Sequence, residues 1–471
     1  MSTEATDILQ NITFDELTIG QSACLTRKLT QDDIALFAVV SGDVNPAHMN
    51  PEFAEKSFFH GVVGHGMWSG ALISTVLGTM LPGPGTIYLE QDIRFKKPVR
   101  VGDTIAVRLS VKTKRSDKPI VVLDCVCQND KGEIVAEGTA TVLAPTERIS
   151  VARPALPAVQ LYPADHYQSI VSGAAQLGTI RVAVVHPVSA NAIQAVQEAT
   201  HEQLMTPILI GPAARIQQAA KDNGTDITGW ELIDTEHSHA AAQKAAELAA
   251  SGQVDAIMKG SLHSDELLEA IVRKENALRT ERRISHAYIM DTPLYHKPLI
   301  ITDAAINIAP TLEEKADICR NAIDLWRALF DHDLKPKVAL LSAVETVTTR
   351  MPSTLDAACL CKMADRGQIA DAILDGPLAF DNAISKQAAE DKGITSPVAG
   401  DADIIVVPNI ESGNALAKQL TFLGNAGAAG IVLGARVPII LTSRADSLRT
   451  RLLSCVVALY LARARQSGKI K

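Results

Sequence analysis

The sequence predicts two unlike domains: an α+β domain, followed by an α/β domain with a doubly wound sheet and two subdomains. Three observations support this prediction. Residues 88–143 hold strand signals of alternating polarity, and they follow one long apolar helical segment over residues 61–81. Beyond residue 163, short apolar β runs alternate with alanine-rich helices. Between these two patterns lies a proline-rich stretch, residues 145–163, which is typical of a linker.

A chain of 471 residues is long enough for two or three domains. The change of pattern gives the boundaries that we expect. Residues 1–11 should be a flexible arm and residues 12–147 the first domain. Residues 148–164 should be the proline-rich linker, and residues 165–471 the second domain.

The first domain should consist of an antiparallel sheet around one helix. Thr30 is a favourable cap for a helix over residues 31–40, whose apolar residues recur at helical spacing. The segment 61–81 contains few charges, so we expect a helix that the sheet covers on most sides. Strong strand signals follow this helix, and the last two form a hairpin. These signals cover residues 88–95, 104–114, 120–129 and 134–143.

In the second domain, apolar strands alternate with helices of roughly ten to fifteen residues. This alternation indicates a parallel sheet that helices cover on both faces. The expected strands are residues 180–185, 207–211, 254–258, 299–302, 338–342, 404–407 and 437–441.

Composition argues against several classes of function. The net charge of -8 argues against nucleic acid or an anionic membrane as a partner. No apolar run reaches the roughly 18 residues that a membrane span needs, and the first residues do not resemble a signal peptide. Seven cysteines, an odd number in a long chain, imply no disulfide framework. We expect a cytoplasmic protein with no metal and no permanently bound cofactor.

The first motif that suggests chemistry is Asp-x-Asn-Pro-x-His at residues 43–48. Asn45 is a favourable helix cap, and the proline after it suits the first helical position. Asp43 therefore precedes the helix, and His48 lies on its first turn. A carboxylate and an imidazole in this arrangement can converge on a water molecule for acid–base chemistry. The alternative is that both are only capping and turn residues.

A second motif, Gly-His-Gly-Met, occupies residues 64–67 before the apolar helical run, where glycines leave backbone N–H groups open to a carbonyl oxygen. Together the two motifs resemble the MaoC-like (R)-specific enoyl-CoA hydratases of the hotdog fold, over most of residues 12–145. The resemblance implies that Asp43 and His48 activate water and that the Gly66 N–H holds the thioester oxygen. It also implies that Asn45 and Ser74 lie near the substrate. Ala47 departs from the larger apolar residue that is usual in the family.

In the second domain, small hydrogen-bonding residues stand directly after several predicted strands. Examples are Lys259, the segment 303–307, the segment 408–414 and the segment 443–447. Ligands of doubly wound sheets bind at the carboxyl ends of the strands. Such a rim suits a small anion that backbone amides, hydroxyls and a guanidinium hold. Taken singly, each segment could be an ordinary turn or cap.

Taken in order, these segments resemble the phosphate acetyltransferase and phosphate butyryltransferase family, over about residues 165–471. The resemblance implies reversible acyl transfer between coenzyme A and inorganic phosphate. It places Ser443 near the thiol and Arg444 on the phosphate. The floor of the site would consist of Asn409, Gly413 and Asn414, with Lys259 also binding substrate.

One position departs from this family. Acetyltransferases have a catalytic aspartate seven residues after the serine that matches Ser443, and this chain has Thr450 there. Asp446 is then the nearest candidate for a general base, and residues 444–447 look more like the butyryltransferase branch. A second phosphate-binding arginine is also expected. The sequence leaves open which one it is among Arg273, Arg279, Arg282 and Arg283.

We therefore expect a bifunctional enzyme whose substrates are acyl-CoA thioesters and phosphate. A single hotdog unit exposes a sheet edge, so we expect a homodimer or a higher homo-oligomer. Two alternatives stay open. The hotdog half could act as a thioesterase, or the C-terminal half could be a catalytically idle sensor of acyl-CoA.

Overall fold

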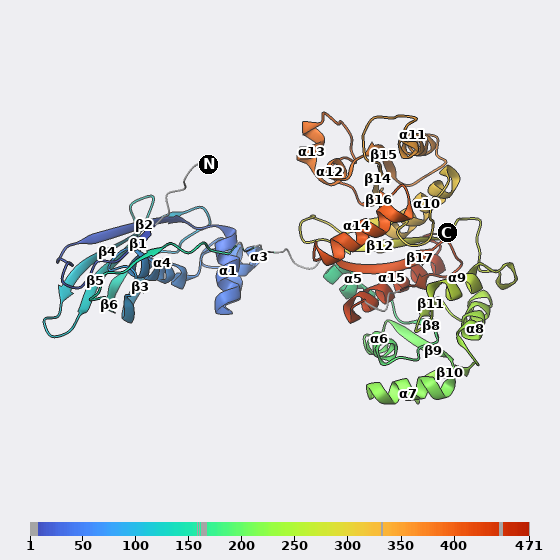
Figure 1. Ribbon diagram of the computed structural model, residues 1–471, viewed down its shortest axis with the longest axis horizontal. Coiled ribbons are helices and arrows are strands. Elements are labelled where there is room, and N and C mark those ends of the chain that lie inside the picture. The colour runs from blue at the N-terminus through green and yellow to red at the C-terminus, as the bar shows by residue number, and fades with distance from the viewer. Residues whose placement is uncertain are drawn as a thin grey trace. The chain divides into compact units, whose positions relative to one another are not determined.

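The computed structural model describes residues 8–157, 159, 161, 167–330, 333–441 and 446–470. The chain divides into two compact units, Met1–Leu161 and Tyr162–Lys471 (Figure 1). None of the described helices has both the length and the apolar character needed to cross a bilayer.

The N-terminal unit is built on a five-stranded antiparallel sheet in the order β2-β4-β5-β6-β3. Helix α4, Gly66–Thr79, packs against β2, β3 and β4 and buries Ile73 and Val76 in the core of this unit. This is the α+β hotdog arrangement expected from the sequence. The strands are β2 (Ser22–Lys28), β3 (Ile87–Phe95), β4 (Thr104–Lys114), β5 (Ile120–Asn129) and β6 (Ile134–Leu143).

The short helices of this unit follow their capping residues. Helix α1, Gln31–Ser41, begins with a capping box in which Thr30 and Asp33 satisfy each other's backbone N–H groups. Helices α2, Pro46–Met49, and α3, Pro51–Lys56, follow in succession. The central helix is shorter than the expected 61–81. It begins only at Gly66, because the residues before it form an irregular segment in which Val63 bridges to Arg100.

Two expectations about the ends of this unit were wrong. Residues 8–10 were expected in a flexible arm and residues 150–152 in the linker, but they form β1 (Ile8–Gln10) and β7 (Ser150–Ala152), which pair antiparallel. Beside them, the Asn11 side chain donates to the Glu147 carbonyl at 2.7 Å and accepts from the Ile149 N–H at 2.8 Å. Strands of three residues show no periodicity, so the sequence pattern could not reveal them.

The C-terminal unit is built on an eleven-stranded sheet in the order β10-β9-β8-β11-β18-β17-β12-β13-β16-β14-β15. The doubly wound α/β class is confirmed, but the sheet is mixed rather than parallel, because β12 and β17 run antiparallel to their neighbours. Only short connections join β12 to β13 and β17 to β18, and parallel strands need a longer crossover. The strands are β8 (Ile180–Val185), β9 (Met205–Gly211), β10 (Glu231–Asp234), β11 (Ala256–Lys259), β12 (Ser285–Asp291), β13 (Leu299–Thr302), β14 (Lys337–Leu341), β15 (Ile373–Leu378), β16 (Ile404–Val406), β17 (Gly427–Leu433) and β18 (Ile439–Ile440).

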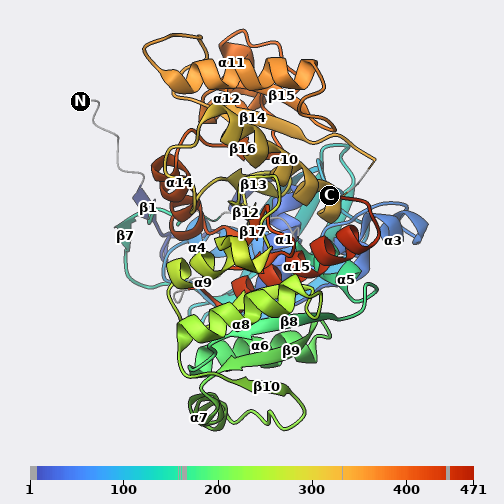
Figure 2. The ribbon, with the colours of Figure 1, turned by 90° about the vertical axis from the view of Figure 1, so that its right-hand side faces the viewer.

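Helices cover both faces of this sheet, so alternate strand residues enter different cores. Val182 and Val184 of β8 face the core shared with α5, α6, α10 and α15, whereas Ala183 and Val185 face the core shared with α8 and α9 (Figure 2). The helices are α5 (Tyr167–Ala174), α6 (Ala190–His201), α7 (Ala213–Asn223), α8 (Ser238–Ala250), α9 (Ser264–Val272), α10 (Leu312–Leu329), α11 (Pro352–Asp365), α12 (Phe380–Ile384), α13 (Lys386–Asp391), α14 (Ile410–Phe422) and α15 (Leu448–Gln466), with a short 3-10 turn at Lys274–Asn276.

Candidate functional sites

Two helix starts bring Asp43, His48 and Gly66 of the N-terminal unit together. Asn45 caps α2, because its Oδ1 accepts from the Ala47 N–H at 3.0 Å, and its own N–H donates to Asp43 Oδ1 at 3.2 Å. These bonds hold Asp43 in the loop before the helix. Gly66 is the first residue of α4, so its backbone N–H has no acceptor within that helix.

The hydrogen bond of His48 determines which of its ring nitrogens can act as a base. Nδ1 lies 2.7 Å from the carbonyl oxygen of Val63. A carbonyl oxygen only accepts, so Nδ1 carries the proton and Nε2 has the free lone pair. Asp43 is exposed and His48 is half-buried, so water can reach the pair. The arrangement therefore offers a carboxylate and a basic imidazole to one water molecule.

His65 is a residue of this site that sequence reasoning missed. Its side chain is buried, and its Nε2 donates to the backbone oxygen of Asp43 at 3.0 Å. Its ring lies 4.0 Å, centroid to centroid, from that of His48. Within the described part of the chain, its Nδ1 is buried without a hydrogen-bond partner. His65 therefore supports both catalytic candidates. Its place between the two glycines of the Gly-His-Gly-Met motif is the sequence signal for it, although the prediction rested on the glycines alone.

Asp43, His48 and His65 could together hold a metal ion. One ligand atom from each lies within 4.8 Å of the others. A carboxylate with two imidazoles suits a divalent transition metal. An ion held by all three would occupy the place where Asp43 and His48 can hold water.

Gly66 lies at a narrow place, whereas Ser74 lies further along α4. A Cβ on Gly66 would stand 3.3 Å from the ring of Phe95, so the site is narrow at the N–H that would bind a carbonyl oxygen. Ser74 is exposed and lies eight residues further along α4, about 12 Å at the rise of an α-helix. Asn45 acts as a cap.

In the C-terminal unit, Ser443 and Arg444 lie outside the described residues. Asp446 is among the described residues. Burial raises the pKa of Tyr288 in β12, and the Asp446 carboxylate raises it further, which places Asp446 near that strand. Thr450 belongs to the cap of α15, where its N–H donates to Ser447 Oγ at 3.1 Å.

The structure brings Asn409, Gly413 and Asn414 together on the first turns of α14. Asn409 caps this helix by accepting from the Ser412 N–H at 3.0 Å. The Asn414 side chain donates to the carbonyl oxygen of Ala304 at 3.2 Å. A Cβ on Gly413 would lie only 2.7 Å from the Asp303 carbonyl oxygen, so only glycine fits. The three residues thus pack on the loop that follows β13.

Asp303 organises that loop from inside. It is 2% exposed, and its carboxylate accepts from the N–H groups of Ala305 and Ile306 at 3.0 Å and of Asn307 at 3.1 Å. Burial lowers the pKa of the neighbouring His286 to about 4, although the Asp303 carboxylate acts in the opposite direction. Asp303 stands directly after β13, and this position predicted a role for the segment 303–307 without singling out Asp303.

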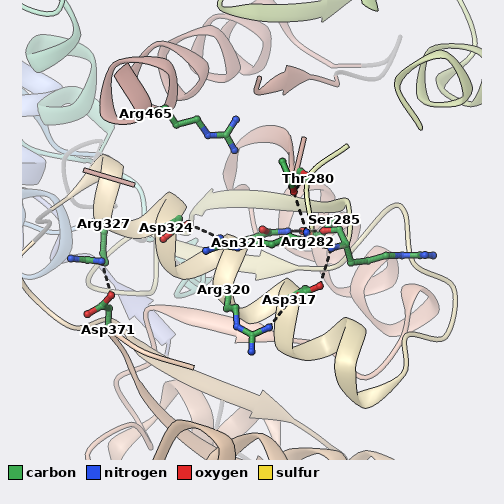
Figure 3. Close-up of polar contacts among 12 residues, drawn as sticks. Thr280, Arg282, Ser285, Asp317, Arg320, Asn321, Asp324, Arg327, Asp371 and Arg465 are labelled. Atoms are coloured by element: carbon green, nitrogen blue, oxygen red, sulfur yellow. Dashed lines mark hydrogen bonds and ion pairs between the residues drawn. The ribbon is translucent and has the colours of Figure 1, made fainter. Parts of the chain in front are cut away.

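Only one of the four candidate arginines is bonded to this loop. Arg283 Nε donates to Asn307 Oδ1 at 2.7 Å, while its Nη1 pairs with Glu314 of α10 at 3.1 Å. Arg282 instead pairs with Asp324 of α10 at 2.6 Å (Figure 3). Arg273 pairs with Glu269 at 2.7 Å, and Arg279 forms a backbone bridge with Ala435. Arg283 is therefore the best placed of the four for an anion near the Asp303 loop.

Lys259 belongs to the predicted rim through a different strand, β11, from the one that precedes the Asp303 loop. It is the last residue of β11, which pairs with β18 through Met258 and Ile440. It therefore stands beside β18, which precedes Ser443 in the sequence. Lys259 is 7% exposed and lines a cavity of about 410 Å³.

Comparison with known proteins identifies relatives of the C-terminal unit. Residues 238–459 match the family described as phosphate acetyl/butaryl transferase. A phosphate acetyltransferase of Rickettsia prowazekii (strain Madrid E) is 58% identical over 298 residues, which are 63% of this chain and 85% of the relative. A solved branched-chain phosphotransacylase from Enterococcus faecalis V583 is 32% identical, with a TM-score of 0.54. That match covers 60% of this chain and 99% of the other.

Comparison also finds matches to the N-terminal unit. Residues 17–125 match the family described as MaoC like domain. The solved R-hydratase PhaJ1 from Pseudomonas aeruginosa, in its unliganded form, is 42% identical. Its match covers 33% of this chain and 99% of that one, with a TM-score of 0.32. The family matches confirm the two resemblances drawn from the motifs.

Proposed function

Because this chain belongs to the phosphate acetyl/butyryl transferase family through its C-terminal unit and carries a MaoC-like domain in its N-terminal unit, we propose that it catalyses two reactions of acyl-CoA thioesters. The first is hydration of a trans-2-enoyl-CoA to an (R)-3-hydroxyacyl-CoA. The second is reversible acyl transfer between coenzyme A and inorganic phosphate. Neither reaction as proposed uses a permanently bound cofactor.

In hydration, Asp43 and His48 hold one water molecule against the substrate. Its oxygen bonds to C3, one of its protons moves to the site base, and a proton returns to C2. Negative charge develops on the thioester oxygen during this addition, and the Gly66 N–H stabilises it. A single donor of this kind is typically worth about 3 kcal/mol.

The observation that carries this proposal is the convergence of the carboxylate, the imidazole and the start of α4 in one small volume. Purified protein should hydrate crotonyl-CoA, and Asp43→Asn should abolish this activity. Release of free thiol from crotonyl-CoA with no hydrated product would instead support the thioesterase alternative.

In acyl transfer, the protein must position two anionic substrates and neutralise the charge on phosphate and on the tetrahedral intermediate. The 58% identity to a phosphate acetyltransferase carries this half of the proposal. Wild type should consume an acyl-CoA thioester only when phosphate is present, and Arg444→Ala should abolish that loss.

The sensor alternative rests on Thr450, which takes part in the cap of α15 where the acetyltransferases have a catalytic aspartate. If wild type shows no phosphate-dependent loss of acetyl-, propionyl- or butyryl-CoA, the C-terminal unit binds acyl-CoA without turning it over.

We also propose that the chain acts as a homo-oligomer in the cytoplasm. Strand β3 is an edge of its sheet and exposes Ile87 and Leu89, 55% and 51% respectively, and such an edge invites pairing with a second copy. All seven cysteines are free, which fits a reducing compartment. A monomer on a sizing column at micromolar concentration would contradict the first statement.

A further inference from the structure

A cavity of about 980 Å³ in the C-terminal unit takes no part in either proposed reaction. It lies between the C-terminal ends of α10 and α15 and the helix α5, which Figure 1 shows beside α15. We refer to this cavity, whose lining includes Trp326, Leu334 and Arg463, as the α10–α15 pocket. Its walls combine apolar side chains with an excess of positive charge, and each property restricts what the pocket can bind.

The α10–α15 pocket lies at the opposite end of two strands from the candidate residues for acyl transfer. Lys297 and Pro298 line it directly before β13, and Asp403 lines it directly before β16. Asp303 follows β13, and the segment with Asn409 follows β16. The strands have four and three residues, so roughly 10–13 Å of extended chain separates their two ends. The pocket is therefore distinct from the site at the Asp303 loop.

Aromatic and aliphatic side chains form much of the wall of the α10–α15 pocket. Trp326, Leu329 and Ile170 line it and are 9%, 6% and 5% exposed. The ring of Phe330 lies 5.4 Å, centroid to centroid, from that of Trp326. Leu334 is 58% exposed, so it lies where the pocket opens to solvent. A ligand with an apolar body gains free energy by replacing water along such walls.

The charged side chains of the α10–α15 pocket favour an anion. Four cations stand against two carboxylates, namely Lys297, Arg327, Arg463 and Lys469 against Asp333 and Asp403. The Asp403 carboxylate is already paired with the Lys297 ammonium at 2.7 Å. Among the described residues, Arg463 contacts no carboxylate: its Nη1 donates to Gln466 Oε1 at 2.7 Å and its Nη2 to the carbonyl oxygen of Thr179 at 2.6 Å. These neutral acceptors hold the guanidinium in place and leave its positive charge for a ligand.

The volume of the α10–α15 pocket lies at the upper end of the range for small-molecule sites, so an acid of two or three carbons leaves most of it empty. We propose that the pocket binds an amphipathic organic anion, a carboxylate on an apolar chain of about eight carbons. The apolar walls hold the chain. Arg463 and Lys469, which stand near the end of α15 and just beyond it, attract the carboxylate. Neither proposed reaction needs such a ligand, so this inference goes beyond both of them.

The test is equilibrium dialysis of the full chain against radiolabelled octanoate. Octanol has the same chain without the charge, and acetate has the charge without the chain. Octanoate should bind saturably, and unlabelled octanol or acetate should compete only at concentrations at least about tenfold higher than unlabelled octanoate. Absence of saturable octanoate binding would overturn the proposal. Competition by octanol at the same concentration as octanoate would overturn it as well, because no anion would then be recognised.

Leu334→Asp locates the bound octanoate. Leu334 is exposed, so the substitution leaves the core intact and places a repelling carboxylate at the opening of the pocket. The Kd for octanoate should rise at least about tenfold. Leu423→Asp is the matched control, since Leu423 is 82% exposed and does not line the pocket. It should bind octanoate like wild type, and equal affinity in all three proteins would place octanoate elsewhere.

Arg463→Met tests the charge. Its Kd for octanoate should rise about tenfold, the order of a charge-assisted hydrogen bond, while its affinity for octanol stays within about twofold of that of wild type. Arg463→Lys keeps the charge and should recover most of the loss. Lys418→Met is the control, because Lys418 is exposed on α14 and does not line the pocket. Unchanged octanoate affinity in a folded Arg463→Met protein would contradict the proposal.

Coenzyme A separates the α10–α15 pocket from the acyl-transfer site. The Kd for octanoate should stay within about twofold when coenzyme A is present at millimolar concentration, because the two sites lie at opposite ends of β13 and β16. Competitive displacement of octanoate by coenzyme A would place octanoate at an acyl-CoA site and overturn the proposal. The dialysis depends on no turnover, so its outcome is the same whether or not the chain catalyses the two proposed reactions.

Discussion

His65 touches both residues that would activate water in hydration, and no part of the chemistry requires it to touch the substrate. It bonds to the Asp43 backbone oxygen, and its ring lies against that of His48 at an interplanar angle of 37°. We expect His65→Phe, which keeps a ring but loses the donor, to lower kcat for crotonyl-CoA hydration about tenfold, the order of one hydrogen bond. KM should change little. His65→Gln, which can place an N–H near the same oxygen, should recover part of the loss. Full activity in a folded His65→Phe protein would contradict this positioning role.

The three possible metal ligands at this site lead to a second prediction. Hydration as proposed uses Asp43 and His48 to hold water, so a metal ion that binds both should compete with it. Dialysis against a chelator should leave hydration unchanged, and added Zn²⁺ should inhibit it. Rates measured before chelation, after chelation and after Zn²⁺ addition check this. Activity that disappears with chelation and returns with Zn²⁺ would show that the ion is part of the machinery.

His286 makes stability depend on pH. Burial lowers its native pKa to about 4, while the unfolded residue titrates near its ordinary value of 6.5. Between these values the unfolded state binds more protons than the native state. The contribution of His286 to the free energy of unfolding is therefore complete above about pH 6.5 and falls as the pH drops toward 4. The loss is at most about 3 kcal/mol. Urea unfolding at pH 7 and 5 should show a smaller pH effect in His286→Gln than in wild type.

His201→Gln is the control for that experiment, because the His201 side chain is 80% exposed. It should keep the pH effect of wild type. An equal pH effect in wild type and His286→Gln would mean that His286 does not take part in the acid sensitivity.

The position of a single residue was predictable where that residue lies within one short motif. Asp43, His48 and Gly66 belong to such motifs, and local capping rules place all three. His65 and Asp303 were missed because their roles come from contacts made in the folded chain. His65 bonds to a backbone oxygen 22 residues away, and the buried Asp303 carboxylate lies close enough to His286 to raise its pKa against the effect of burial. Neither contact leaves a pattern along the sequence.

At the scale of elements, strand β3 should govern assembly of the N-terminal unit. Leu89 is 51% exposed on this edge strand, so Leu89→Lys should weaken pairing with a second copy and give a smaller oligomer in sedimentation at micromolar concentration. Val39→Lys is the matched control, since Val39 is 76% exposed on α1 of the same unit. An unchanged mass in Leu89→Lys would exclude this edge as the interface.

Long, strongly alternating strands were predicted with their observed bounds, as β4, β5 and β6 show. The sequence pattern missed β10, β12, β15 and β17 as well as β1 and β7, and two of these failures have clear physical reasons. β1 and β7 are three residues each and pair across about 140 positions, so their partner, not their own pattern, makes them strands. β12 and β17 are mostly buried on both faces, so neither shows the alternation of polar and apolar residues that marks a half-exposed strand, and their residues carry no sign of their direction in the sheet.

At the scale of the whole molecule, the change of pattern around residues 145–163 predicted two unlike folds in one chain, and the structure divides at Leu161. The described residues of each unit have their own cores, and the candidate residues of each reaction lie within one unit. Hydration and acyl transfer should therefore be separable chemistries that share a class of thioester substrate.

The most direct measurement of that claim is a pair of assays on three proteins: wild type, Asp43→Asn and Arg444→Ala. Each is tested for crotonyl-CoA hydration and for phosphate-dependent loss of an acyl-CoA. Wild type should show both activities. Asp43→Asn should lose hydration and keep transfer, and Arg444→Ala should lose transfer and keep hydration. Loss of both activities in either folded variant, or absence of either activity from wild type, would contradict the account.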